Sequence, residues 1–161
     1  MTEAFVGIGS NVEPEKHVRM AVQLMRERFG GLRLSPVYRN RAVGFAGDDF
    51  LNLVAAFECD LRVDALNSAL DAIELACGRE RGAARFSPRT LDLDLLLYGT
   101  RVDAALKLPR KEILKYDFVL RPLAELAPGE RHPETGMTYI EHWERFPGDK
   151  AGLTAIVLSG L

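Results

Sequence analysis

The most constraining feature of the sequence is a segment over residues 91–98 in which leucine alternates with aspartate. Alternation with a period of two predicts a strand buried on one face, because successive side chains of a strand point to opposite sides. The leucines expected to face the core are Leu91, Leu93, Leu95 and Leu97. Asp92 and Asp94 would then lie side by side on the other face.

Hydrophobic patterns elsewhere predict the elements that surround this strand. Strands are expected at 4–9, 32–38, 50–59 and 153–158, helices at 14–29 and 63–77, and helical pieces at 110–127 and 138–146. The first four strands, 91–98 included, interleave with the first two helices, which is typical of a ferredoxin-like α+β sandwich (the split βαβ arrangement), here with an antiparallel or mixed sheet and a helical C-terminal extension. Because no repeat or linker interrupts the chain, we expect a single domain spanning residues 1–161.

Composition excludes several classes of protein. Lysine plus arginine number 21 and aspartate plus glutamate 23, which gives a formal net charge of -2. A chain this close to neutral is not a general binder of nucleic acid or of anionic membranes. No apolar run reaches the roughly 20 residues of a membrane span, and the first residues do not form a secretion signal. Cys59 and Cys77 have no metal-binding spacing, so we expect free thiols in a cytoplasmic protein.

The paired aspartates are the first candidates for chemistry. Two neighbouring carboxylates repel each other, so Asp92 and Asp94 require a compensating cation. Mg²⁺ is commonly held by one or two carboxylates together with substrate phosphates. The alternative is an acidic strand face that only keeps the sheet soluble.

Arginines are concentrated just before this strand. Those in the short loop are Arg79, Arg81, Arg85 and Arg89. Guanidinium groups match phosphate oxygens in pairs, so arginines beside two carboxylates indicate a site for a metal-bridged polyphosphate. The alternative is a surface loop whose arginines pair with nearby acidic residues.

Two further patterns are less specific. Phe50 and Phe118 each adjoin polar loop sequence and could stack on a flat heterocycle, although burial in the core is the alternative for both. GIGSN at residues 7–11 follows a predicted strand and precedes a predicted helix. It lacks the third glycine of a dinucleotide fingerprint, so we expect a tight turn there.

Four blocks of the sequence together resemble the 6-hydroxymethyl-7,8-dihydropterin pyrophosphokinase family of folate biosynthesis. The blocks are GIGSN at 7–11, FLN at 50–52, PRTLDLDLLLYG at 88–99 and FVLRPLAELAP at 118–128. They stand in the expected order over nearly the whole chain. The resemblance implies a ferredoxin-like α+β fold, usually monomeric. It also implies transfer of the β,γ-diphosphate of ATP, with two Mg²⁺ ions, to the hydroxymethyl group of a reduced pterin, with AMP leaving.

The resemblance also implies roles for individual residues. The metal ligands would be Asp92 and Asp94, which would act in catalysis with Arg79 and Arg89. ATP would be bound by Arg79, Arg81, Arg89, Arg110 and Lys115. The pterin would be bound by Val43, Gly44, Phe50, Asn52 and Phe118. No nucleic acid, membrane or obligate protein partner is implied.

Some positions depart from the family pattern. They are Arg110 where the family has histidine, Tyr116 for arginine, Phe86 for tryptophan and Asp71 for glutamine. These departures fall mainly around the expected ATP phosphates, where Arg110 and Lys115 could restore the lost charge. They leave open a divergent, non-catalytic pterin- or nucleotide-binding paralogue. They also leave open a regulatory ferredoxin-like module in which the acidic pair is only structural.

Overall fold

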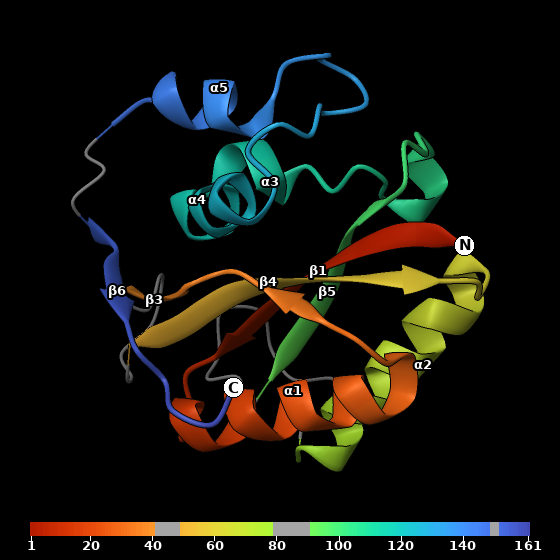
Figure 1. The fold of residues 1–161 in the computed structure, drawn as a ribbon, viewed down its shortest axis with the longest axis vertical. Coiled ribbons are helices and arrows are strands. Elements are labelled where there is room, and N and C mark those ends of the chain that lie inside the picture. The colour runs from red at the N-terminus through yellow and green to blue at the C-terminus, as the bar shows by residue number, and fades with distance from the viewer. Residues whose placement is uncertain (41–48, 79–90, 149–151) are drawn as a thin grey trace.

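The computed structural model describes residues 1–40, 49–78, 91–148 and 152–161. These residues form one sheet with helices on both faces (Figure 1). The strands are β1 Thr2–Ser10, β2 Arg33–Leu34, β3 Val37–Asn40, β4 Phe50–Cys59, β5 Asp92–Tyr98 and β6 Thr154–Ile156. Their order across the sheet is β5-β1-β4-β3-β6, with β2 also paired to β4. All these pairings are antiparallel.

Two long helices cover one face of the sheet, and shorter helices lie on the other (Figure 1). The long helices are α1 Pro14–Phe29 and α2 Val63–Ala76. The shorter ones are η1 Ala104–Leu106, α3 Glu112–Lys115, α4 Asp117–Leu126 and α5 Tyr139–Glu144. The predicted helices and the helical C-terminal extension are therefore present. No described helix is both long enough and apolar enough to cross a bilayer.

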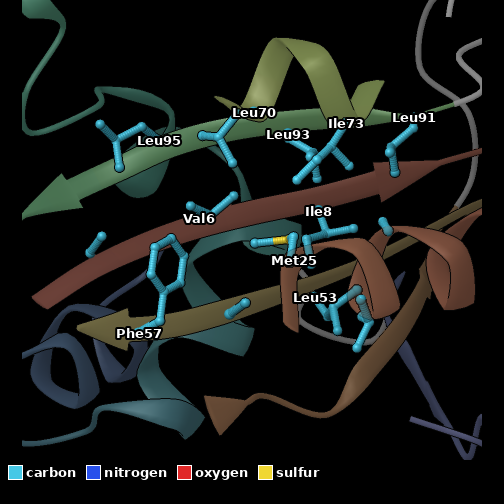
Figure 2. Close-up of a cluster of buried hydrophobic side chains, with 14 of the residues drawn as sticks. Val6, Ile8, Met25, Leu53, Phe57, Leu70, Ile73, Leu91, Leu93 and Leu95 are labelled. Carbon is cyan, nitrogen blue, oxygen red and sulfur yellow. The ribbon is translucent and has the colours of Figure 1, made fainter. Parts of the chain in front are cut away.

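The larger hydrophobic core lies between the sheet and the two long helices (Figure 2). The antiparallel register pairs Val6 with Leu95 and Ile8 with Leu93, so their side chains enter this core together. Residues of α1 and α2, among them Met25 and Leu70, pack onto them. The inward orientation predicted for Leu91, Leu93 and Leu95 is confirmed.

The prediction that Leu97 shares the face of these leucines is wrong. The register between β1 and β5 shifts between Phe5 and Val6, which inserts an extra residue, Leu96, into β5. A bulge of this kind reverses which side the following residues face. Leu96 and Leu97 consequently join a second buried cluster with Phe5, beneath α3 and α4.

The strand predicted over residues 32–38 is divided into β2 and β3 at Ser35 and Pro36. Pro36 has no backbone N–H to donate to a ladder. The hydroxyl of Ser35 instead accepts the N–H of Val54 at 2.8 Å, while its own N–H donates to the Val54 carbonyl at 2.9 Å. These bonds hold the segment between β2 and β3 against β4, so that β3 also pairs with β4.

Two leucines of α2 offer a matched test of the larger core. Leu70 is 1% exposed and Leu75 is 43% exposed, and both lie in the same helix. We expect Leu70→Ala to lower the free energy of unfolding by about 2–5 kcal/mol, because it leaves a cavity. Leu75→Ala should change it by less than about 0.5 kcal/mol. Urea denaturation measures both, and similar losses for the two variants would contradict the assigned burial.

Candidate functional site

The sheet register gathers chemically distinct residues in one row near the end of β1. Gly9 pairs with Asp92 of β5 on one side and with Asn52 of β4 on the other. Asn52 pairs in turn with Tyr38 of β3. Directly opposed residues of antiparallel strands point to the same side of a sheet. The row therefore presents a carboxylate, an amide and a phenol on the face opposite α1 and α2.

The two aspartates lie in adjacent rows of this face. Asp92 is opposite Gly9 and Asp94 is opposite Gly7, so no β1 side chain stands beside either carboxylate. Asp92 is half-buried and the side chain of Asp94 is 54% exposed. The side-by-side placement predicted from the alternation is confirmed, whereas their role as metal ligands stays a prediction. Within the described ranges, no three His, Cys, Asp or Glu side chains group closely enough to hold a metal ion by themselves.

Arg110 lies beside this acidic pair. One of its terminal nitrogens, Nη1, is 3.9 Å from Oδ1 of Asp94, and its Nε donates to the Leu95 carbonyl at 3.0 Å. The backbone N–H of Arg110 also donates to the Leu96 carbonyl. An ion pair this long to an exposed carboxylate is weak, so Arg110 offsets the repulsion between the aspartates only in part. Arg110, which is expected near the ATP phosphates, thus lies next to Asp94, which is an expected metal ligand.

Two aromatic rings stack on each other at the start of α4. The ring of Tyr116 stacks on that of Phe118 with centroids 4.9 Å apart and an interplanar angle of 16°. The ammonium of Lys115 lies over the Tyr116 ring, 5.2 Å from its centroid. Phe50 and Phe118 are both half-buried rather than enclosed in the core. In the sequence, Tyr116 is notable only because it stands where the family has an arginine. In the structure, its ring covers one face of Phe118.

The amide of Asn52 is hydrogen-bonded to β3 and lies over a glycine of β1. Its Nδ2 donates to Oδ1 of Asn40, the last residue of β3. A Cβ added at Gly9 would lie 2.8 Å from Oδ1 of Asn52, closer than real side chains approach. Gly9 is therefore needed for the close approach of Asn52 and not for a tight turn, because β1 continues through Ser10. The turn predicted at GIGSN is wrong over this part of the motif.

Tyr38 connects the row to α4. Its hydroxyl donates to the Glu125 carboxylate, and the Arg121 guanidinium lies over its ring at 4.7 Å. Burial, together with the hydrogen bond to Glu125, raises the pKa of Tyr38 to about 12. The hydrogen bond from this phenol to Glu125 ties α4 to β3. Nothing in the local sequence marks Tyr38, since its partner is distant in the chain.

A buried carboxylate ties α2 to β5. Oε2 of Glu74 accepts the backbone N–H of Leu93, the residue between the two aspartates, at 2.8 Å. The remaining predicted site residues lie outside the described residues. They are Val43, Gly44, Arg79, Arg81 and Arg89.

Comparison with known proteins extends this description. The family model of 7,8-dihydro-6-hydroxymethylpterin-pyrophosphokinase (HPPK) matches residues 5–128. The 2-amino-4-hydroxy-6-hydroxymethyldihydropteridine pyrophosphokinase of Pseudomonas aeruginosa is 42% identical over 140 residues, which are 81% of this chain and 83% of that protein. The protein of the same name from Synechocystis sp. is 36% identical over 143 residues, 86% of this chain and 73% of the other.

A solved structure of an HPPK-DHPS in complex with substrates has the same fold, with a TM-score of 0.70 at 10% identity. That likeness covers 89% of this chain and 45% of the solved chain. Together, the sequence matches define an enzyme that transfers diphosphate, a pyrophosphokinase. The chain belongs to the 7,8-dihydro-6-hydroxymethylpterin-pyrophosphokinase family of folate synthesis.

Two glycines of β1 test the packing around Asn52. A Cβ at Gly9 would meet Asn52 Oδ1 at 2.8 Å, whereas a Cβ at Gly7 would meet Leu96 at 3.6 Å, an ordinary contact. We expect Gly9→Ala to lower the free energy of unfolding by about 1–3 kcal/mol through overpacking, and Gly7→Ala to lower it by less. Chemical denaturation gives both values. Equal losses would show that Asn52 does not occupy the space above Gly9.

A double-mutant cycle tests the stacked rings of Tyr116 and Phe118. Stacked aromatic pairs contribute about 0.5–1.5 kcal/mol beyond the area they bury. We therefore expect Tyr116→Ala and Phe118→Ala to couple by about that amount in unfolding free energy. Tyr116→Phe, which keeps the ring, should retain the coupling. Additive losses from the two alanine variants would refute the contact.

Proposed function

We propose that this chain transfers the β,γ-diphosphate of ATP, with Mg²⁺, to the hydroxymethyl group of 6-hydroxymethyl-7,8-dihydropterin and releases AMP. The observation that carries the proposal is the row through Gly9, which has Asp92 on one side and Asn52 on the other. One strand separates the two residues, so their backbones stand roughly 10 Å apart. A heterocycle bound at Asn52 could therefore direct a short hydroxymethyl arm toward phosphates bound near Asp92.

We assign the pterin to Phe50, Asn52 and Phe118, and also to Val43 and Gly44, which follow β3 in the sequence. Half-buried rings offer apolar faces to a flat heterocycle, and an amide offers one donor and one acceptor to its edge. The stack of Tyr116 on Phe118 supports this role, because it holds the ring in place and covers one of its faces. The opposite face of Phe118 would then receive the pterin.

We assign the ATP phosphates to Arg79, Arg81, Arg89, Arg110 and Lys115. Arg110 supports the assignment, because its Nε is engaged by the Leu95 carbonyl while its terminal nitrogens extend toward Asp94. A guanidinium anchored in this way loses little freedom when it binds a phosphate. Arg79 and Arg89 would add charge where the transferred group becomes most negative.

We assign Mg²⁺, two ions in all, to Asp92 and Asp94. Carboxylate oxygens are the ligands that this ion prefers, and substrate phosphates and water commonly complete its shell. The fit is supported by the bare glycine backbone opposite both carboxylates and by the exposure of Asp94. When bound, the ions would neutralise phosphate charge.

The transfer is a displacement at the β-phosphorus of ATP. The hydroxyl oxygen of the substrate forms the new bond to this phosphorus, the bond to the oxygen bridging to the α-phosphate breaks, AMP leaves, and the hydroxyl proton is released to water. Such transfers rely mainly on positioning and electrostatic stabilisation. Tyr38 is not placed to act as a base, since its hydroxyl already donates its proton to Glu125. The chain's contribution would be to align the hydroxyl and to surround the phosphates with positive charge.

We also propose that residues 1–161 form a single domain with a ferredoxin-like core that acts in the cytoplasm on small molecules alone. The strand order β5-β1-β4-β3, with α1 and α2 on one face, supports the ferredoxin-like assignment. The near-neutral composition supports the absence of a nucleic-acid partner.

AMP release from ATP, Mg²⁺ and 6-hydroxymethyl-7,8-dihydropterin tests the proposal. We expect turnover by the wild-type chain and a loss of about a hundredfold or more in Asp94→Asn, since a charge that acts on the transferred phosphates is removed. Because Asp94 is exposed, the free energy of unfolding of Asp94→Asn should differ from that of the wild type by less than about 0.5 kcal/mol. Asp60→Asn is the control, because Asp60 is exposed and follows Cys59 at the far end of the sheet.

The outcomes separate the alternatives. Pterin or ATP binding without AMP release from the wild-type chain would indicate a non-catalytic binding protein. An Asp94→Asn variant as active as Asp60→Asn would remove Asp94 from the metal site.

A further inference from the structure

We propose that Asn40 is a positioning residue that determines which way the amide of Asn52 faces, and thereby how the site holds the pterin ring. The inference rests on the proposed function, because it takes Asn52 as the residue that meets the heterocycle. It concerns the side chain of Asn40, at the end of β3.

Asn40 is placed to act on Asn52 and not on solvent. It is the last residue of β3 and is only 8% exposed. It stands opposite Phe50, while Asn52 stands opposite Tyr38, so the two asparagines are diagonal neighbours on the same face. The Nδ2 of Asn52 donates to Oδ1 of Asn40.

The other end of the Asn52 amide faces a different environment. Its Oδ1 lies over Gly9, where a Cβ would come within 2.8 Å. The nitrogen end of the amide thus meets an acceptor on β3, and the oxygen end meets bare backbone on β1. With Asn40 held as it stands in the structure, a half-turn of the Asn52 amide would bring Oδ1 of Asn52 against Oδ1 of Asn40, with no proton between them. Two acceptors in contact, that of Asn40 buried and that of Asn52 half-buried, are destabilised, so this orientation is disfavoured.

A fixed amide presents its remaining groups in a fixed order. One N–H of Asn52 is committed to Asn40, which leaves the other N–H and the carbonyl oxygen for a ligand. A ring whose edge has the complementary order can pair with both, while a wrongly turned amide would leave groups unpaired. Asn40 therefore acts on pterin binding through Asn52 without touching the phosphates. Its loss should affect the pterin and spare ATP.

Three variants test this inference in steady-state kinetics with 6-hydroxymethyl-7,8-dihydropterin and ATP. Asn40→Leu, similar in size but without an acceptor, should raise the KM for the pterin about tenfold and leave the KM for ATP unchanged. Asn40→Asp keeps the acceptor and should retain a pterin KM near that of the wild type. In an Asn52→Leu background, Asn40→Leu should have no further effect, because the amide through which it acts is gone.

Three results would overturn the inference: an unchanged pterin KM in Asn40→Leu, an equal loss in Asn40→Asp, or an additive effect in the Asn52→Leu background. Thermal unfolding is measured first, and Asn40→Ala replaces Asn40→Leu if the latter does not fold. Calorimetric titration with the pterin alone measures the pterin affinity of the same variants without requiring turnover. An inactive wild-type chain whose pterin affinity still responds to Asn40 would refute the proposed function and leave the role of Asn40 standing. An active chain whose pterin KM does not change with Asn40 would refute the role of Asn40 and leave the proposed function standing.

Discussion

The structure depends on the double pairing of β1, which is hydrogen-bonded on one side to β4 and on the other to β5. Because side chains alternate along a strand, a slip of one residue would exchange the two faces of the sheet. The register that buries Ile8 against Leu93 is the same register that leaves Gly9 between Asp92 and Asn52. The hydrophobic core and the candidate site are therefore set by the same backbone hydrogen bonds. Burial of the apolar face supplies the free energy that holds the polar residues in their row.

The two faces of the sheet are covered differently, and this difference locates the site. On one face, α1 and α2 bury a continuous cluster of aliphatic side chains (Figures 1 and 2). On the other, the bulge in β5 turns Leu96 and Leu97 toward α3 and α4, which pack over one part of the sheet. The polar row lies along the same face, where Tyr38 reaches across to Glu125 of α4. The same face of the sheet therefore carries both the candidate site and the apolar residues onto which α3 and α4 pack. The bulge places Leu97 among those apolar residues.

The sequence predicted those features that repeat locally along the chain. Alternating leucine and aspartate predicted β5 and the common face of Asp92 and Asp94, and helical spacing predicted α1 and α2. Leu97 was assigned to the wrong face because a bulge adds one residue without any change in the alternation that precedes it. Family resemblance pointed to Asn52, but it carried no information about Asn40 as its hydrogen-bond partner. Such diagonal contacts depend on how strands align and not on spacing within either one.

By itself, the sequence determined the periods of its strands and helices, the family to which the chain belongs and the presence of an acidic pair beside basic residues. Those properties follow from neighbouring side chains, whose directions are dictated by the local backbone. Only the tertiary structure decided that Gly9 makes room for Asn52, that Tyr116 stacks on Phe118 and that Tyr38 donates to Glu125 of α4. Each of these depends on segments brought together by sheet register and helix packing, so their geometry exists only once the core has formed.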